Sequence, residues 1–257
     1  MTNVGQAVVG RVRDLLPVLR ERAQETEDAR DVPAESVKAL TETGFFRLLQ
    51  PATYGGHEAD PVTFLTAVRL IASACGSTGW VASVLGVHPW QLALFPPRAQ
   101  EEVWGADQAT RMSSSYAPTG RAGEVDGGHR LTGRWSFSSG CGHATWVLLG
   151  AIVGEGDGRP PDFRTFLLPA SDYVIDDVWD TVGLRHRQQR HRRRRRVCAR
   201  APLAQLRRRL PLRLPRPGRQ PGAAVPAAIR VAVLVLDHHP DHRHGGRRLR
   251  RARGVPA

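Results

Sequence analysis

The uneven distribution of aromatic residues limits where this chain can fold more than any other feature of its sequence. All 6 Trp, 3 Tyr and 7 Phe residues precede position 180, and the last of them is Trp179. Residues 1–185 carry 16 Lys and Arg against 22 Asp and Glu, whereas residues 186–257 carry 21 Arg against Asp237 and Asp241. A segment without aromatic side chains and with so much like charge cannot bury enough apolar surface to offset the entropy lost on ordering. We therefore expect residues 1–185 to fold and residues 186–257 to be disordered.

The cysteine content and the N-terminal sequence restrict the cellular compartment. Cys75, Cys141 and Cys198 form an odd and sparse set, which argues against a disulfide framework and favours a reducing compartment. The first residues, MTNVGQAVVGRVRDLL, lack the long apolar core of a signal peptide, and no stretch reaches about eighteen apolar residues. We expect a cytoplasmic protein without a membrane partner.

Hydrophobic periodicity divides the folding part of the chain in two. Up to residue 110 the apolar residues recur at helical spacing; Asp31 is placed to cap one helix, and Pro89 should bend or end another. After residue 110, short runs rich in β-formers are separated by Gly, Pro and Asp. The sequence predicts an α+β fold with a helical domain over 1–110, a partial β-barrel-like domain over 111–185 and an Arg-rich tail over 186–257.

Two strings of residues resemble motifs of the acyl-CoA dehydrogenase superfamily. GFFRLLQPATYGG, at residues 44–56, resembles the GL…L…P…YGG element of that family. RLTGRWSFSSGCGHATW, at residues 130–146, resembles its L-N-G-x-K-x-W-I-T-N flavin strand, with Phe137 at the aromatic position and Ser139 at the Thr position. The resemblance covers residues 10–185 and implies a helical N-terminal domain, a central β-domain and a C-terminal four-helix bundle.

One branch of the superfamily is more similar than the dehydrogenases are. Dehydrogenases have T-E-P-x-x-G-S-D before the flavin strand, whereas this chain has SSSYAPTGRAGEVDGG; it also contains CGSTGWV, VHPWQLALF and RAQEEVWG. These strings resemble the two-component aromatic hydroxylases, especially the oxygenase subunits that act on secosteroid phenols. The resemblance implies an oxygenase that receives reduced FMN, or FAD, from a flavin reductase and hydroxylates a phenolic, steroid-derived substrate with O2. It also implies a homotetramer. An acyl-CoA dehydrogenase with bound FAD is the alternative.

The resemblance implies a set of site residues, and each of them also has a structural explanation. The candidate catalytic residues are His88, Ser114 and Ser139. The candidate cofactor-binding residues are Trp80, Ser115, Phe137, Ser138 and Ser139. The serines could equally serve turns or nearby backbone, the histidine could be a satisfied polar group at a helix end, and the aromatic residues could belong to an ordinary core. Cys141 and His143 are too few for a metal site and are interpreted as structural.

The tail admits three interpretations. The runs HRRRRR and GGRRLRRAR suggest a nucleic-acid-binding arm, which would make the chain a non-enzymatic binder. DHHPDHRH, at residues 237–244, suggests metal binding. The third interpretation is translation out of frame, and in that case we expect no nucleic-acid partner.

The out-of-frame interpretation can be tested on the sequence itself. Synonymous codons can be chosen for residues 186–203 that, read one frame away with GG placed in front, give G-T-G-S-N-D-I-V-V-D-D-V-F-A-R-E-H-R. That string resembles the next element of the family, G-T-G-S-N-x-x-V-x-D-x-F-V-P-x-H-R, which should follow DTVGLR. A frameshift after Arg185 implies that the C-terminal bundle is missing and that this chain hydroxylates little or nothing.

Overall fold

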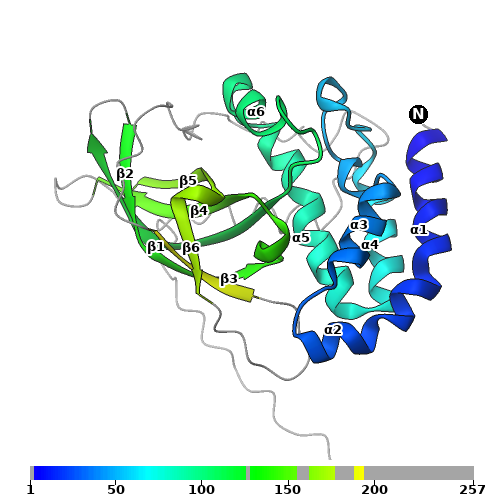
Figure 1. Ribbon diagram of the computed structural model, residues 1–257. Helices are drawn as coiled ribbons and strands as arrows, with labels where there is room; N and C mark the ends of the chain where they lie inside the picture. Colours follow the sequence, from blue (N-terminus) through cyan, green and yellow to red (C-terminus); the bar gives the residue numbers. More distant parts are fainter. Residues whose placement is uncertain (1–2, 126–127, 155–161, 177–187, 194–257) are drawn as a thin grey trace, which may run out of the picture. The chain divides into compact units, whose positions relative to one another are not determined.

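The computed structural model describes residues 3–125, 128–154, 162–176 and 188–193 (Figure 1). All of them belong to one compact unit, Met1–Leu212; a second unit, Arg213–Ala257, lies outside the described residues. Helices occupy the chain up to Trp104, and the first strand begins at Met112. The predicted α+β fold with a helical N-terminal region is therefore confirmed. The division into three domains at residues 110 and 185 stays a prediction.

Six α-helices precede the first strand. Their bounds are α1 Asn3–Glu21, α2 Ala23–Ala29, α3 Ala34–Glu42, α4 Pro61–Ala74, α5 Gly76–Leu92 and α6 Pro97–Trp104, with 3-10 turns η1 Phe45–Arg47 and η2 Ala52–Tyr54. The helical core joins the apolar sides of α1, α3, α4 and α5 around Leu40, Phe45 and Phe64. Helix α5 is buried on most of its sides because it packs against α4 and against strands β1 and β3. It therefore links the helices to the β region.

Close contact between α4 and α5 depends on glycine. A Cβ atom added at Gly79 would lie 2.5 Å from the Cα atom of Ala72, which no real side chain tolerates. The absence of a side chain at Gly79 thus lets the two helix backbones approach each other. This approach holds the first half of α5 against the helical core.

Pro89 does not end its helix, because α5 continues through this buried proline to Leu92; a bend at Pro89 stays a prediction. The expectation for Asp31 is wrong. Asp31 does not cap α3, which starts after Pro33 without a side-chain cap. The Asp31 carboxylate instead accepts a hydrogen bond from the Val32 backbone N–H at 2.9 Å.

The β region forms two sheets. The strands are β1 Met112–Val125, β2 Gly128–Thr132, β3 Arg134–Ser139, β4 Trp146–Val153, β5 Asp162–Pro169, β6 Tyr173–Asp176 and β7 Gln188–Arg193, with 3-10 turns η3 Cys141–His143 and η4 Ala170–Asp172. One sheet has the order β2-β1-β4-β5, in which β1 and β4 are parallel and the other pairs antiparallel. The second sheet has the order β3-β7-β6 and is antiparallel.

Trp135 is the largest side chain in the core of the β region. It is fully buried, and its indole Nε1–H donates a hydrogen bond to the Gly150 carbonyl oxygen at 2.6 Å. A Cβ atom at Gly120 would lie 2.3 Å from the indole Cζ2 atom, so glycine there makes room for the ring. Trp135 on β3 thereby ties the second sheet to β1 and β4 of the first.

The expected disorder of residues 186–257 needs correction at one place. Gln188–Arg193 form β7, in which Gln189 pairs with Ser138 of β3, and Arg192 pairs with Val174 of β6. The ladder uses backbone groups that every residue other than proline supplies, so a segment rich in Arg can complete it. Residues 194–257, with the DHHPDHRH cluster, lie outside the described residues.

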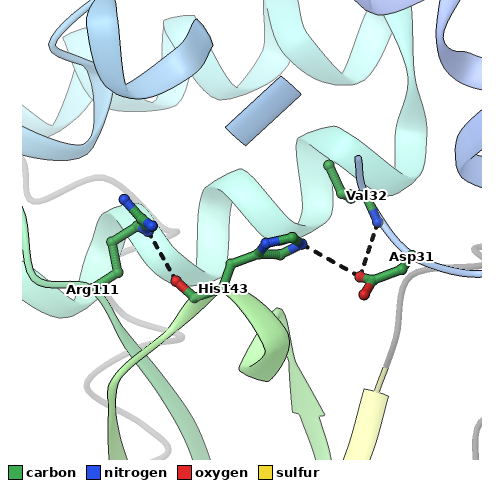
Figure 2. A network of polar contacts seen from close by, with 4 residues as sticks. All are labelled: Asp31, Val32, Arg111 and His143. Atoms are coloured by element: carbon green, nitrogen blue, oxygen red, sulfur yellow. Dashed lines mark hydrogen bonds and ion pairs between the residues drawn. The ribbon is translucent and has the colours of Figure 1, made fainter. Parts of the chain in front are cut away.

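A polar network joins the end of the helical region to the β region (Figure 2). The Arg111 Nε–H donates to the His143 carbonyl oxygen at 2.9 Å, and His143 Nε2 lies 3.4 Å from the Asp31 carboxylate. The Arg111 guanidinium also lies 5.8 Å from the centre of the Phe46 ring. These contacts support a structural role for His143, which stays a prediction, and Asp31 has a partner far along the chain instead of a helix end.

Candidate functional site

The predicted site residues gather where α5 meets β1 and β3. Trp80 and His88 lie on α5, Ser114 and Ser115 on β1, and the remaining three, Phe137, Ser138 and Ser139, on β3. Helix α5 is placed there by its apolar sequence, which has to be covered on both sides. The structure brings some of these residues into direct contact and turns others into the interior.

Trp80 and Ser139 are in direct contact. The Trp80 indole Nε1–H donates a hydrogen bond to the Ser139 hydroxyl oxygen at 2.9 Å, across 59 positions of sequence. Ser139 is buried, whereas the Trp80 side chain is 46% exposed. Because the indole supplies the proton of this bond, the hydroxyl hydrogen of Ser139 points to a different acceptor.

Phe137 has an unusual backbone conformation. Its φ is 63°, and it lies at an irregularity between Trp135 and Ser138 in the pairing of β3 with β7. A positive φ is strained for a bulky residue, and bulges of this kind re-aim side chains beside functional sites. The Phe137 side chain is 69% exposed as a result.

Ser115 and Ser138 point into the protein. The Ser115 hydroxyl donates to the Ser136 carbonyl oxygen at 2.6 Å. Ser138 is fully buried, and its hydroxyl has no hydrogen-bond partner among the described residues. The Ser115 hydroxyl is thus already hydrogen-bonded to the backbone of β3. The proposed contact of Ser115 and Ser138 with a cofactor stays a prediction.

His88 is buried in a polar cluster that faces β1. Its Nδ1 atom lies 3.4 Å from the Tyr116 hydroxyl, and its Nε2 atom is buried with no partner in the described part of the chain. Burial lowers the pKa of His88 to about 4, and a hydrogen bond with Gln91 acts in the opposite direction. The ring is therefore neutral at physiological pH, so it can accept a proton.

Sequence reasoning did not single out Tyr116 and Gln91, two members of this cluster. The Tyr116 hydroxyl donates a hydrogen bond to the Gln91 side-chain oxygen. Burial raises the pKa of Tyr116, whereas its hydrogen bonds with the side chains of Ser114 and Gln91 lower it. The available signals were the i, i+3 spacing of His88 and Gln91 on one helix and a tyrosine in a run of serines.

The arrangement suits a flat aromatic cofactor that needs a hydrogen bond at one edge. The partly exposed Trp80 indole contacts the hydroxyl of Ser139, and the exposed Phe137 lies two positions before Ser139 on β3. A flavin ring system has these properties, so the residues fit the cofactor that the sequence suggested. They could hold the ring by stacking and by one hydroxyl contact.

Other features of the described residues offer no rival site. A small recess beside Arg111 is lined by Phe46, Arg47 and Gln50, among others, and none of the predicted site residues borders it. The described residues contain no cluster of three or more potential metal ligands. In the same part of the chain, no helix has the length and apolar character needed to cross a membrane.

Known proteins resemble this chain in sequence and in structure. Residues 6–111 match the family described as acyl-CoA dehydrogenase, N-terminal domain. The oxygenase subunit HsaA of a flavin-dependent monooxygenase from Rhodococcus jostii is 63% identical over 175 residues, which are 68% of this chain and 46% of that protein. The oxygenase component of an FADH2-dependent resorcinol hydroxylase from Rhizobium is 43% identical over 179 residues, 69% of this chain and 43% of that protein.

A solved structure shows the same fold. The HsaA monooxygenase from Mycobacterium tuberculosis superposes with a TM-score of 0.72 at 54% identity, over 74% of this chain and 52% of that one. The chain thus spans about half the length of the relatives it matches. Both the helices and the strands that carry the candidate site fall within a fold shared with these proteins, so the chain belongs to the acyl-CoA dehydrogenase superfamily and, over about half their length, is similar to oxygenase subunits of flavin-dependent monooxygenases.

Proposed function

We propose that this chain is the oxygenase component of a two-component flavin-dependent monooxygenase that hydroxylates a phenolic, steroid-derived substrate with O2. The observation that carries the proposal is the contact between Trp80 and Ser139, on the strand that also carries the exposed Phe137. It combines an apolar surface for a flat ring with a hydroxyl at its edge. The names of the relatives, which include flavin-dependent and FADH2-dependent enzymes, support the same cofactor class.

The cofactor side of the site is assigned to α5 and β3. Reduced FMN, or FAD, supplies the activation of O2 when it is bound. Trp80 and Phe137 bind the ring by stacking, and Ser139 positions it through its hydroxyl. Ser115 and Ser138 are proposed to line the cofactor side from β1 and β3, where the Ser115 hydroxyl also donates to the Ser136 carbonyl oxygen.

The substrate side of the site is assigned to His88 and Ser114. A neutral, buried imidazole can take the proton of a phenol, which makes the aromatic ring richer in electrons. Ser114 is half-buried on β1, two residues before Tyr116, and orients the substrate oxygen. Burial of His88 also keeps water away from the proton that it receives.

The relatives are named as oxygenase subunits or components, which supports a separate reductase as partner. We propose a flavin reductase as the source of reduced cofactor and a homotetramer in the cytoplasm as the working assembly. We also propose that residues 186–257 are read out of frame, so that hydroxylation by this chain is weak. Peptide mass spectrometry of the natural protein decides this point, because tryptic peptides after Arg185 differ between the two reading frames.

Flavin binding is the direct test of the proposal. Titration of the 257-residue chain with reduced FMN under anaerobic conditions should quench tryptophan fluorescence, and Trp80→Phe should remove most of the change. Ser139→Ala should weaken binding, and in the chain with the frame restored it should release more H2O2 per hydroxylated product. Losing one donor aimed at a reacting centre costs about 3 kcal/mol, roughly a hundredfold in product formation.

Ser73→Ala is the matched control for this test. Ser73 lies on α4, where its hydroxyl donates to the Leu70 carbonyl oxygen, on an exposed side of the helix. This variant should bind flavin like the parent chain. Equal product and H2O2 yields in Ser139→Ala and Ser73→Ala would refute the role of Ser139. Oxidation of a CoA ester in place of hydroxylation of a phenol would favour a dehydrogenase.

A further inference from the structure

Three polar side chains, those of the buried His88 and Gln91 and of the partly buried Tyr116, form a relay between α5 and β1. The Tyr116 hydroxyl donates to Gln91 Oε1 and lies 3.4 Å from His88 Nδ1. The two rings meet edge to face, with their centroids 6.2 Å apart and their planes at 77°. Gln91 follows His88 by three positions on α5, so both side chains lie on the same side of the helix. The function proposed above uses His88 and assigns nothing to Tyr116 or Gln91.

The relay restricts where the imidazole can carry its hydrogen. A tyrosine hydroxyl has one proton, and Tyr116 gives that proton to Gln91. Toward His88 the same oxygen can therefore only accept, so Nδ1 must be the nitrogen that donates. A neutral imidazole has a single N–H, which leaves Nε2 with a lone pair that can accept a hydrogen bond. Both rings are neutral at physiological pH, since burial lowers the pKa of His88 and raises that of Tyr116.

The reverse arrangement is less favourable. If the Gln91 amide were rotated, its NH2 group would donate to Tyr116, and Tyr116 would donate to His88 Nδ1. The hydrogen would then be on Nε2, which is buried and has no partner in the described residues. A buried N–H without an acceptor is rarer and costlier than a buried acceptor without a donor. The first arrangement is therefore preferred.

We propose that Tyr116 and Gln91 are positioning residues that hold His88 in the tautomer with its hydrogen on Nδ1 and its lone pair on Nε2. Nε2 then accepts the proton of the phenol. The proton transfer from the phenol to Nε2 rests on the proposed function, whereas the tautomer of His88 does not. The relay would make His88 a base before any substrate arrives, because no reorganisation of the ring is needed.

The tautomer can be measured without catalysis. We suggest long-range 1H–15N correlation spectra of the full 257-residue chain with 15N-labelled histidine at pH 7, with His88 assigned through His88→Gln. Nε2 of His88 should resonate as an unprotonated, pyridine-like nitrogen and Nδ1 as a protonated, pyrrole-like nitrogen. Tyr116→Phe should move both signals toward intermediate positions, because the ring then loses the acceptor that selects one tautomer. A protonated Nε2 in the parent chain overturns the proposal.

Tyr54→Phe is the matched control, and Gln91 provides a second test. The Tyr54 hydroxyl contacts Glu101 at the surface, 3.3 Å away, so its loss should leave the His88 signals unchanged. Gln91→Glu keeps an acceptor for the Tyr116 hydroxyl and, as a carboxylate, has no proton to donate, so it should preserve the tautomer. Gln91→Leu removes that acceptor and should not preserve it. These two variants answer the same question if Tyr116→Phe does not fold. Unchanged His88 signals in both Tyr116→Phe and Gln91→Leu would also overturn the proposal.

A phenol titration separates the inference from the proposed function. A simple phenol added to the same sample should shift Nε2 of His88 and leave Nδ1 largely unchanged. If the tautomer is as proposed and phenol shifts neither nitrogen, the positioning relay stands, and the assignment of His88 to a phenolic substrate fails. If Nε2 is protonated, the relay fails whatever the phenol does.

Discussion

Replacing His88 by Gln should remove a large part of the acid sensitivity of this protein. Burial lowers the pKa of His88 to about 4 in the folded state, against 6.5 in the unfolded chain. The folded state binds fewer protons than the unfolded state between these two values. The stabilising contribution of neutral His88 is thus fully present above pH 6.5 and is lost as the pH falls toward 4.

The size of the effect follows from the two pKa values. Relative to pH 7, proton linkage at His88 alone should lower the free energy of unfolding by about 2 kcal/mol at pH 5 and about 3 kcal/mol at pH 4. Urea unfolding of the parent chain and of His88→Gln at several pH values measures the difference. His57 and His129 also have lowered pKa values because of burial and nearby Arg, but their contribution is common to both proteins and cancels. Parallel pH curves would refute the reasoning.

Two further predictions concern packing. Gly79→Val should lower the free energy of unfolding by about 1–3 kcal/mol, because its side chain would overlap the α4 backbone; Gly10→Ala, where a Cβ meets nothing within 4 Å, should be neutral or stabilising in the same urea experiment. Trp135→Phe should also cost about 1–3 kcal/mol, because it leaves the buried Gly150 carbonyl without its donor; a variant as stable as the parent would show that the indole bond contributes little.

Local periodicity predicts the order of elements well and their ends less well. The helical spacing up to residue 110 and the β-formers after it correspond to the observed helices and strands. The helix that does not end at Pro89 and the missing cap at Asp31 have one cause, which is that distant parts of the chain decide the outcome. Packing around α5 outweighs the loss of one hydrogen bond at Pro89, and His143 lies 112 positions after the carboxylate that it approaches.

The candidate site shows the same limit. Ser139 and Trp80 could each be singled out from the strings that surround them, but their contact could not, because it joins a helix to a strand. A site role for Tyr116 could not be predicted for a different reason: a tyrosine on a strand belongs to the ordinary core in most proteins. Only the three-dimensional arrangement shows that its hydroxyl lies between Gln91 and His88.

The way in which β7 joins its sheet has a consequence for whether the strand depends on the reading frame of its codons. The ladder between β3, β7 and β6 recognises peptide groups and not side chains, and proline is the one residue that it would reject. Gln188–Arg193 contain no proline, and neither does G-S-N-D-I-V, which the same codons can spell one frame away. Both strings therefore supply every backbone N–H group that the ladder needs. The two reading frames differ in their side chains, so we expect a change of frame to affect the fold where side chains pack against one another.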